Sequence, residues 1–331
     1  MMSSTAPAFI AAILIAVPAT AGASPASAPT AAKGNRASRR TLDLNALYFG
    51  DTRVALSAQS FVGHESSWAD GDEGQNAFIL DRAEVGVDFR WRGRLGGELR
   101  LEAIRSAAPQ SQLGVDGNSL LLRVKRAWAF YTHSLGPITL SARGGLIPDP
   151  WVETLEGNYD LRDLSPTLAE SGAFFDTSDL GGQLRISGWK GLFRVTAALT
   201  NGEGRNQVEQ NEGKNLHLVL SVVPLRFRWP FLEQTSVGLH GVYRNGSMGA
   251  GSTKNHRLGG AMTLRSRNLF LGSELTFAMG HGGRAERDVL GIGAYANATF
   301  PCGWLGGAVR YDHLDTDRDA SDAIARTVTV A

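Results

Sequence analysis

The chain has 331 residues, of which 43% are hydrophobic and 20% are charged, so its composition excludes a disordered tail. Its 33 basic and 32 acidic residues leave a formal net charge of +1, which excludes the broad basic field of a nucleic-acid-binding protein. The only cysteine, Cys302, excludes an internal disulfide framework and has no zinc or redox motif around it. We therefore expect neither a metal nor a cofactor.

The N-terminus has the features of a secretory signal peptide. Residues 9–17 form an unbroken apolar stretch, and small residues in the A-x-A pattern of signal-peptidase sites follow Pro18. We expect a signal peptide at 1–23, a disordered Ala/Ser/Pro-rich lead at 24–41 and one β-barrel domain at 42–331. Beyond the N-terminus, no apolar run reaches the roughly 18 residues of a membrane helix.

From residue 42 onward, apolar and polar residues alternate with a period of two. Residues 269–279 show this clearly, because Leu271 and Leu275 share one face while Gly272 and Glu274 share the other. Such segments are longer than the roughly five or six residues of a soluble strand, and they match the about 9–11 residues that cross a bilayer. We predict strands at 52–64, 78–92, 95–106, 119–133, 137–147, 180–188, 191–201, 215–225, 234–244, 255–266, 268–280, 287–299, 303–313 and 323–331.

The linkers between these strands alternate between long and short. The predicted short linkers are 93–94, 134–136, 189–190, 267 and 300–302, with 226–233 as one longer exception. Short periplasmic turns alternating with longer external loops are typical of outer-membrane barrels. The fold class is therefore an all-β transmembrane antiparallel β-barrel of the outer membrane, with about 14 strands (12–16) and a long third external loop. A soluble secreted β-protein is the alternative.

The apolar face of the strands would contact lipid, with aromatic residues near its rims. The alternation assigns to this outer face the aromatic residues Trp91, Trp128, Phe130, Tyr243, Phe277 and Tyr311. Arg126 shares the parity of Trp128, which leaves two alternatives. Either a bulge shifts the register of this strand, or one arginine faces lipid at a cost of a few kcal/mol.

The opposite face would line a water-filled lumen, and its charged residues are mostly basic. The predicted channel-lining residues are Arg82, Arg90, Arg100, Arg123, Lys125, Arg143, Arg185, Arg194, Arg257 and Arg265. A basic wall favours the passage of anions. For Arg82 and Arg100 the alternative is that Glu84 and Glu98 pair with them and merely brace the wall.

The third external loop, residues 148–179, is strongly acidic and long enough to suggest a function. Folded inward, it would set acidic groups opposite the basic wall and narrow the pore; left outside, it would form an acidic surface. We favour the inward fold. The predicted constriction residues are Glu153, Glu156, Asp160, Asp163, Glu170 and Asp176.

Three short motifs resemble the phosphate-selective porin family of Gram-negative outer membranes. Residues 78–86 resemble an early strand of that family, residues 142–148 with Trp151 resemble the strand end before its long third loop, and residues 179–181 resemble the return strand. The resemblance covers roughly residues 50–200 and implies a permeable barrel and a homotrimer. Arg82 matches a basic position of the family, but Glu84 stands where a second basic residue is expected. We therefore carry over the fold and the pore class, not phosphate selectivity.

The sequence thus predicts an outer-membrane porin, exported through the periplasm, that lets small anionic or polar solutes diffuse through its lumen. Its expected partners are outer-membrane lipids and these solutes, with no nucleic acid. The alternative is a non-conducting barrel with a structural or anchoring role. We expect no enzymatic activity, because the seven histidines are scattered and no nucleophile has a base at a recognisable spacing.

Overall fold

The structure is a computed structural model, and it consists of one long antiparallel ladder of strands. It describes residues 44–67, 75–105, 120–159, 161–162, 165–205, 209–229, 232–285, 287–299, 306–316 and 324–330. The main sheet has 15 strands, and each pairs with its neighbour along the chain. Its strands are β1 (Leu44–Phe49), β2 (Thr52–Ser67), β3 (Gln75–Trp91), β4 (Leu95–Arg105), β5 (Leu120–Leu135), β6 (Ile138–Pro148), β7 (Ser178–Gly188), β8 (Phe193–Thr200), β9 (Asn215–Trp229), β10 (Leu232–Asn245), β13 (His256–Arg265), β14 (Leu269–Met279), β15 (Val289–Thr299), β16 (Gly306–Asp315) and β17 (Ile324–Val330).

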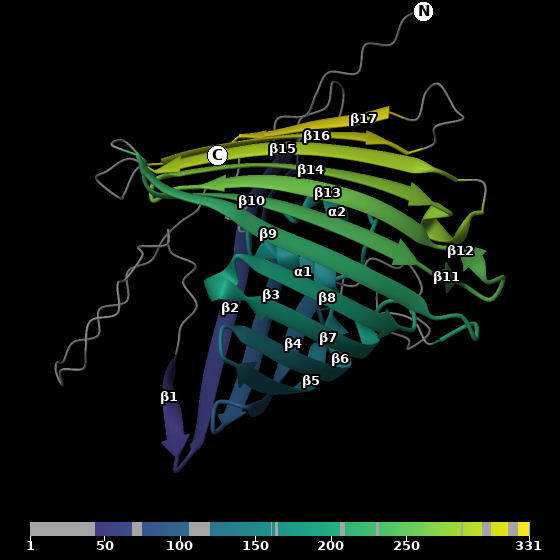
Figure 1. Ribbon diagram of the computed structural model, residues 1–331. Helices are drawn as coiled ribbons and strands as arrows, with labels where there is room; N and C mark the ends of the chain where they lie inside the picture. The colour runs from purple at the N-terminus through teal and green to yellow at the C-terminus, as the bar shows by residue number, and fades with distance from the viewer. Residues whose placement is uncertain are drawn as a thin grey trace, which may run out of the picture.

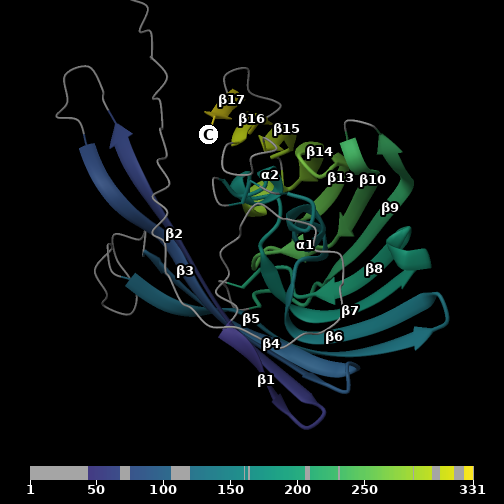
Figure 2. The same ribbon diagram turned by 90° about the vertical axis from the view of Figure 1, so that its left-hand side faces the viewer.

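The sheet is strongly curved, and two short helices lie on its concave side (Figures 1 and 2). These helices are α1 (Pro150–Glu156) and α2 (Leu168–Ser171), and both belong to the third external loop. A small separate hairpin, β11 (Ser247–Met248) with β12 (Thr253–Lys254), and two 3-10 turns, η1 (Trp189–Gly191) and η2 (His281–Gly283), lie between strands. No helix within the described part of the chain is both long and apolar enough to span a membrane.

The predicted alternation of long and short linkers is confirmed, with two corrections. The main sheet of the described residues has 15 strands, within the predicted range of 12–16, because the short strand β1 precedes the first predicted strand. The linker predicted at 226–233 shrinks to residues 230–231, because β9 and β10 continue into it. A β11–β12 hairpin also occupies part of the loop between β10 and β13. The fold class is otherwise as predicted.

The distribution of side chains between the two faces is inverted relative to a soluble protein. Large apolar side chains are exposed on the convex face: Leu122 is 70% exposed and Leu184 is 64% exposed. Charged side chains are buried on the concave face, where Lys125 is 1% exposed and Glu102 is 2% exposed. A soluble sheet would bury the leucines and hydrate the charges. The inversion is what a lipid-facing sheet with a polar interior requires.

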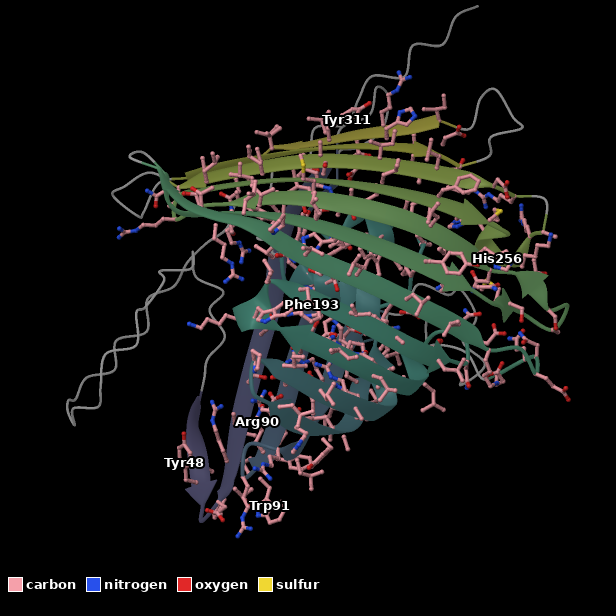
Figure 3. The ribbon with its side chains drawn as sticks, viewed as in Figure 1. Tyr48, Arg90, Trp91, Phe193, His256 and Tyr311 are labelled. Carbon is pink, nitrogen blue, oxygen red and sulfur yellow. The ribbon has the colours of Figure 1, made fainter. Side chains whose placement is uncertain are left out.

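Aromatic side chains gather at the end of the sheet that carries the short turns. Tyr48 and Trp91 lie at this end, whereas His256 lies at the opposite end, beside the longer loops (Figure 3). Trp189 and Phe193, at the η1 turn, meet edge to face with ring centroids 5.3 Å apart. Aromatic residues prefer the boundary between hydrocarbon and water, so this rim marks one edge of the membrane-spanning band.

The register of β5 corrects two of the predicted outward aromatic residues. Arg100 pairs with Arg126 but Leu101 pairs with Val124, so Lys125 is an extra residue in β5 and forms a bulge. The bulge turns Arg126 inward, where it contacts Glu156. It also exchanges the inner and outer faces for the residues of β5 that follow.

Trp128 and Phe130 therefore lie on the inner face, with Trp128 stacked under the guanidinium of Arg143 at 4.5 Å. The outward assignment of these two residues was wrong. Tyr243 and Tyr311 lie exposed on the outer face, as predicted. Phe277 shares the outer face with Leu275, two residues before it.

Candidate functional site: the lumen and its third loop

The third loop turns into the lumen directly after β6, and its first helix begins at a well-formed cap. Asp149 accepts hydrogen bonds from the backbone N–H groups of Trp151 at 2.9 Å and Val152 at 3.1 Å. Pro150 occupies the first turn, where its missing N–H costs nothing. The second carboxylate oxygen of Asp149 lies 3.3 Å from His217 Nδ1 on β9. The cap therefore also ties the start of the loop to the barrel wall.

An apolar core holds the loop against the inside of the barrel. Trp151 and Val152 on α1 are fully buried, and so is Ala169 on α2. The core residues from the loop are Trp151, Val152, Leu155, Leu168, Ala169, Phe174 and Phe175, and those from the wall are Val219, Val242, Ala261, Ala278 and Val289. Burying such side chains contributes roughly 1.5–3 kcal/mol each, so the inward fold of the loop is a packed state. The prediction that the loop folds inward is confirmed.

Glycines on β15 make room for this packing. A Cβ atom at Gly291 would meet the ring of Phe174 at 2.7 Å, and one at Gly293 would meet Leu168 Cδ2 at 3.3 Å. The glycines on the inner face of β15 therefore leave the space that Phe174 and Leu168 of the third loop occupy.

Polar contacts fix the loop to the far wall, formed by β13 to β16. The backbone N–H of Leu168, at the start of α2, donates to Glu274 Oε1 at 2.6 Å. Arg257 Nε donates to the carbonyl of Phe174 at 3.0 Å. Arg310 donates to the hydroxyl of Tyr159 and to Ser165 Oγ, the latter at 3.1 Å. The loop thus reaches across the lumen from β6 to β16.

Glu153 fixes α1 to the near wall through two arginines. Arg143 Nη1 donates to both carboxylate oxygens of Glu153, at 2.9 and 3.0 Å, and Arg185 Nη2 donates to Oε2. Burial raises the pKa of Glu153, but the two guanidinium groups outweigh burial and lower that pKa to about 2. The side chain is therefore a carboxylate at neutral pH. Its negative charge is neutralised by the two arginines of the wall.

The wall between β3 and β5 carries a dense network of ion pairs. Glu84 contacts Lys125 at 2.5 Å and Arg100 at 3.4 Å, while Glu102 contacts Lys125 at 3.4 Å. Further pairs join Arg123 to Glu102 at 2.9 Å, Arg100 to Glu98 at 2.8 Å, and Arg82 to Glu84 and Glu102 at 3.8 and 4.0 Å. In this cluster Arg82 and Arg100 therefore pair with carboxylates of neighbouring positions and brace the wall, which is the alternative stated above.

The acidic residues of the loop are also paired. Glu156 lies 3.3 Å from Arg126 and contacts Arg162, which lies 3.1 Å from Glu170. Burial lowers the pKa of Arg162 to about 10, and Glu170 beside it opposes that change, so the guanidinium stays charged at neutral pH. Asp176 lies 3.7 Å from Arg205. The predicted residues Asp160 and Asp163 lie outside the described residues.

Two of the predicted wall cations have no salt bridge to a carboxylate of the described residues. Within the described residues, Arg194 and Arg257 form no salt bridge, and Arg257 is bound to three backbone carbonyls. Arg90 is exposed, with its guanidinium 5.5 Å from the ring centre of Phe130. Arg265 lies 5.1 Å from the ring centre of Phe270. In the part of the chain that the structure describes, no group of three or more His, Cys, Asp or Glu side chains could hold a metal ion.

Arg126 and Arg205 were not among the predicted site residues. Arg126 faces the lumen because of the β5 bulge, so of the two alternatives that its parity left open the structure confirms the bulge. Arg205 belongs to the loop after β8, and its charge gives no indication that the side chain enters the lumen. Arg162 is the only basic residue in the sequence of the third loop, and this could have marked it as a partner for the acidic residues around it.

No family model and no curated protein matches this chain. Solved structures do align with it. OmpF of Salmonella typhi, in complex with daunomycin, is 16% identical with a TM-score of 0.55, and the alignment covers 85% of this chain and 84% of that one. Outer-membrane-expressed OmpT of Vibrio cholerae aligns at 9% identity and TM-score 0.41, covering 86% and 97% of the two chains. A mutant of the Rh. blastica porin aligns at 12% identity and TM-score 0.44, covering 83% and 89%.

The likeness to OmpF shows that the chain has the fold of a porin-type transmembrane β-barrel. This agrees with the inverted faces of the sheet and with a third loop that folds into the lumen. Membership of the phosphate-selective family stays a prediction from the three sequence motifs.

Proposed function

We propose that this protein is an outer-membrane porin through which small hydrophilic solutes diffuse passively. The inverted sheet is the observation that carries the proposal. Its convex face exposes leucine, valine and tyrosine, and its concave face holds Glu102, Lys125 and many other charged groups. A barrel that keeps charged groups on its inner wall provides a polar path through hydrocarbon, and no reaction is required.

We further propose that the lumen prefers anions. The carboxylates of Glu84, Glu102 and Glu153 are each held by two or more basic side chains. By contrast, Arg194 and Arg257 have no salt bridge to a described carboxylate. Because unpaired positive charge on the wall lowers the energy of an anion in the pore, we expect chloride to permeate more readily than potassium.

The proposed setting is the outer membrane, reached after export through the periplasm, with outer-membrane lipids around the convex face. The predicted signal peptide at 1–23 and the lead at 24–41 lie outside the described residues. A homotrimer is the assembly that the family resemblance implies. Chemical crosslinking of the protein in native membranes tests it, and a ladder that stops at the monomer would contradict it.

Two measurements test the pore. Liposomes that contain refolded protein should swell in small sugars faster than protein-free liposomes do. In a planar bilayer under a KCl gradient, the reversal potential should have the sign of chloride preference, and R194Q should move it toward potassium. The matched control is K190Q, since Lys190 carries the same charge on the exposed η1 turn. Equal shifts in R194Q and K190Q would contradict the role of Arg194.

A second candidate function is a non-conducting barrel that serves as a structural anchor. One observation favours it: the apolar core formed by α1, α2 and the wall fills part of the lumen with packed side chains. A plugged barrel would show neither swelling nor conductance although it is correctly folded. The porin proposal predicts both.

A further inference from the structure

A second loop also enters the lumen, immediately after β8. Its residues 202–205 lie against the end of the third loop, and two backbone N–H groups bind carboxylates there. Gly202 N donates to Asp179 Oδ2 at 2.6 Å, and Arg205 N donates to Asp176 Oδ2 at 3.1 Å. These two acidic residues therefore anchor a neighbouring loop.

The close approach depends on a glycine. Gly204 has a φ of +76°, which side-chain-bearing residues rarely adopt, and a Cβ atom there would lie 2.3 Å from Asp176 Oδ2. The backbone of this segment is thus shaped to lie on Asp176. That shape directs the next side chain, Arg205, into the barrel.

The guanidinium of Arg205 joins the third loop to the wall. Its Nη2 lies 3.3 Å from Glu102 Oε2 on β4, its Nε lies 3.7 Å from Asp176 Oδ1, and its Nη1 donates to Thr177 Oγ1. The Arg205 side chain is 9% exposed and that of Glu102 is 2% exposed. An ion pair buried to this degree is screened less by water than a surface pair, so it holds its two partners together more strongly.

The topology gives this bridge its importance. Residues 176–177 precede β7, and β7 is separated from β4 by β5 and β6. Three strand spacings correspond to about 14 Å along the wall. One side chain therefore holds the return limb of the third loop, residues 172–177, to a wall strand three positions away.

We propose that Arg205 is a positioning residue of the lumen, supplied by a second loop, which holds the return limb of the third loop against β4. Its removal widens the lumen and leaves Asp176 without its cation, which shifts ion preference toward cations. Glu102 retains Arg123 and Lys125 in that variant, so the wall itself stays paired. This inference rests on the proposed pore for its functional consequence.

The first test is single-channel recording of R205A, R205K and a matched control. The control is K214A, which removes one positive charge from the same loop, where Lys214 is exposed and forms an ion pair with Glu209. R205A should give a larger conductance than the wild type and a reversal potential shifted toward potassium. R205K should keep the reversal potential but not the conductance, because an ammonium cannot span Glu102, Asp176 and Thr177 together. Wild-type values in R205A, or equal changes in K214A, would overturn the proposal.

A second test does not depend on conduction. In a C302S background, A169C places a thiol on α2 at a position that is fully buried in the wild type. Its labelling by a water-soluble maleimide should become at least about tenfold faster in R205A, because losing the contacts of Arg205 with Glu102 and Thr177 frees the return limb and favours local opening. K214A should leave the labelling rate unchanged.

The two tests separate the failure of each proposal. A wild-type protein that folds but does not conduct contradicts the proposed function, and the labelling rates then decide the role of Arg205. Faster labelling in R205A alone supports the positioning role. Equal rates in R205A and the wild type overturn it, whether or not the barrel conducts.

Discussion

Replacing Glu153 by glutamine should loosen the third loop, and the size of the effect follows from its surroundings. Arg143 and Arg185 hold the pKa of Glu153 at about 2, against an ordinary value of 4.5. This difference corresponds to about 3 kcal/mol of stability at neutral pH. A group with a lowered pKa stabilises the fold above its ordinary pKa and loses that contribution as the pH falls through the lowered value. The contribution should therefore drop to about half at pH 3.

The assay is equilibrium unfolding of wild-type and E153Q protein by urea in detergent micelles, at pH 7 and pH 3. Tryptophan fluorescence is a suitable probe because Trp151, on the same helix, is fully buried until the loop leaves its seat. The control is D51N, which breaks an exposed pair with Arg92 and should cost at most about 1 kcal/mol. An E153Q protein within about 0.5 kcal/mol of the wild type at pH 7, or a difference that ignores pH, would refute the reasoning.

Three further changes test the loop seat and the lipid face. G291A brings a Cβ atom to 2.7 Å from Phe174 and should destabilise the loop by about 1–3 kcal/mol in urea unfolding, whereas G144A, with open space around it, should be neutral. L184R puts a charge on the outer face and should reduce the free energy of folding into lipid vesicles by about 2–4 kcal/mol; unchanged folding would contradict the lipid contact. D149A removes the cap of α1 and should lower the urea midpoint by an amount equivalent to about 1 kcal/mol.

The fold was predictable because a strand that crosses lipid leaves a simple record in the sequence. Leu271 and Leu275 must face hydrocarbon while Glu274 faces the interior, so a period of two persists over the whole strand. The β5 bulge left only one sign, the arginine Arg126 at a position of lipid-facing parity. One inserted residue, Lys125, changes the face of Arg126 and Trp128, and the hydrogen-bond register decides between a bulge and a lipid-facing arginine.

Many members of the candidate site could be proposed from the sequence, but Arg126 and Arg205 could not, and neither could the pairing of the charges. An acidic loop and a basic wall were both visible, and the loop does fold inward. Which charges neutralise one another depends on contacts between distant segments, such as Glu153 with Arg143 and Arg185. The bridge from Arg205 to Glu102 joins residues about a hundred positions apart, so local spacing carried no sign of it.

The most direct test of the account is single-channel recording of the refolded wild-type protein in a planar bilayer, with folding verified by circular dichroism and by heat-modifiable gel mobility. A water-filled, anion-preferring lumen predicts discrete current steps and a reversal potential of chloride sign under a KCl gradient. The absence of current steps from protein that is verified to be folded would contradict the proposed pore and would favour the non-conducting barrel.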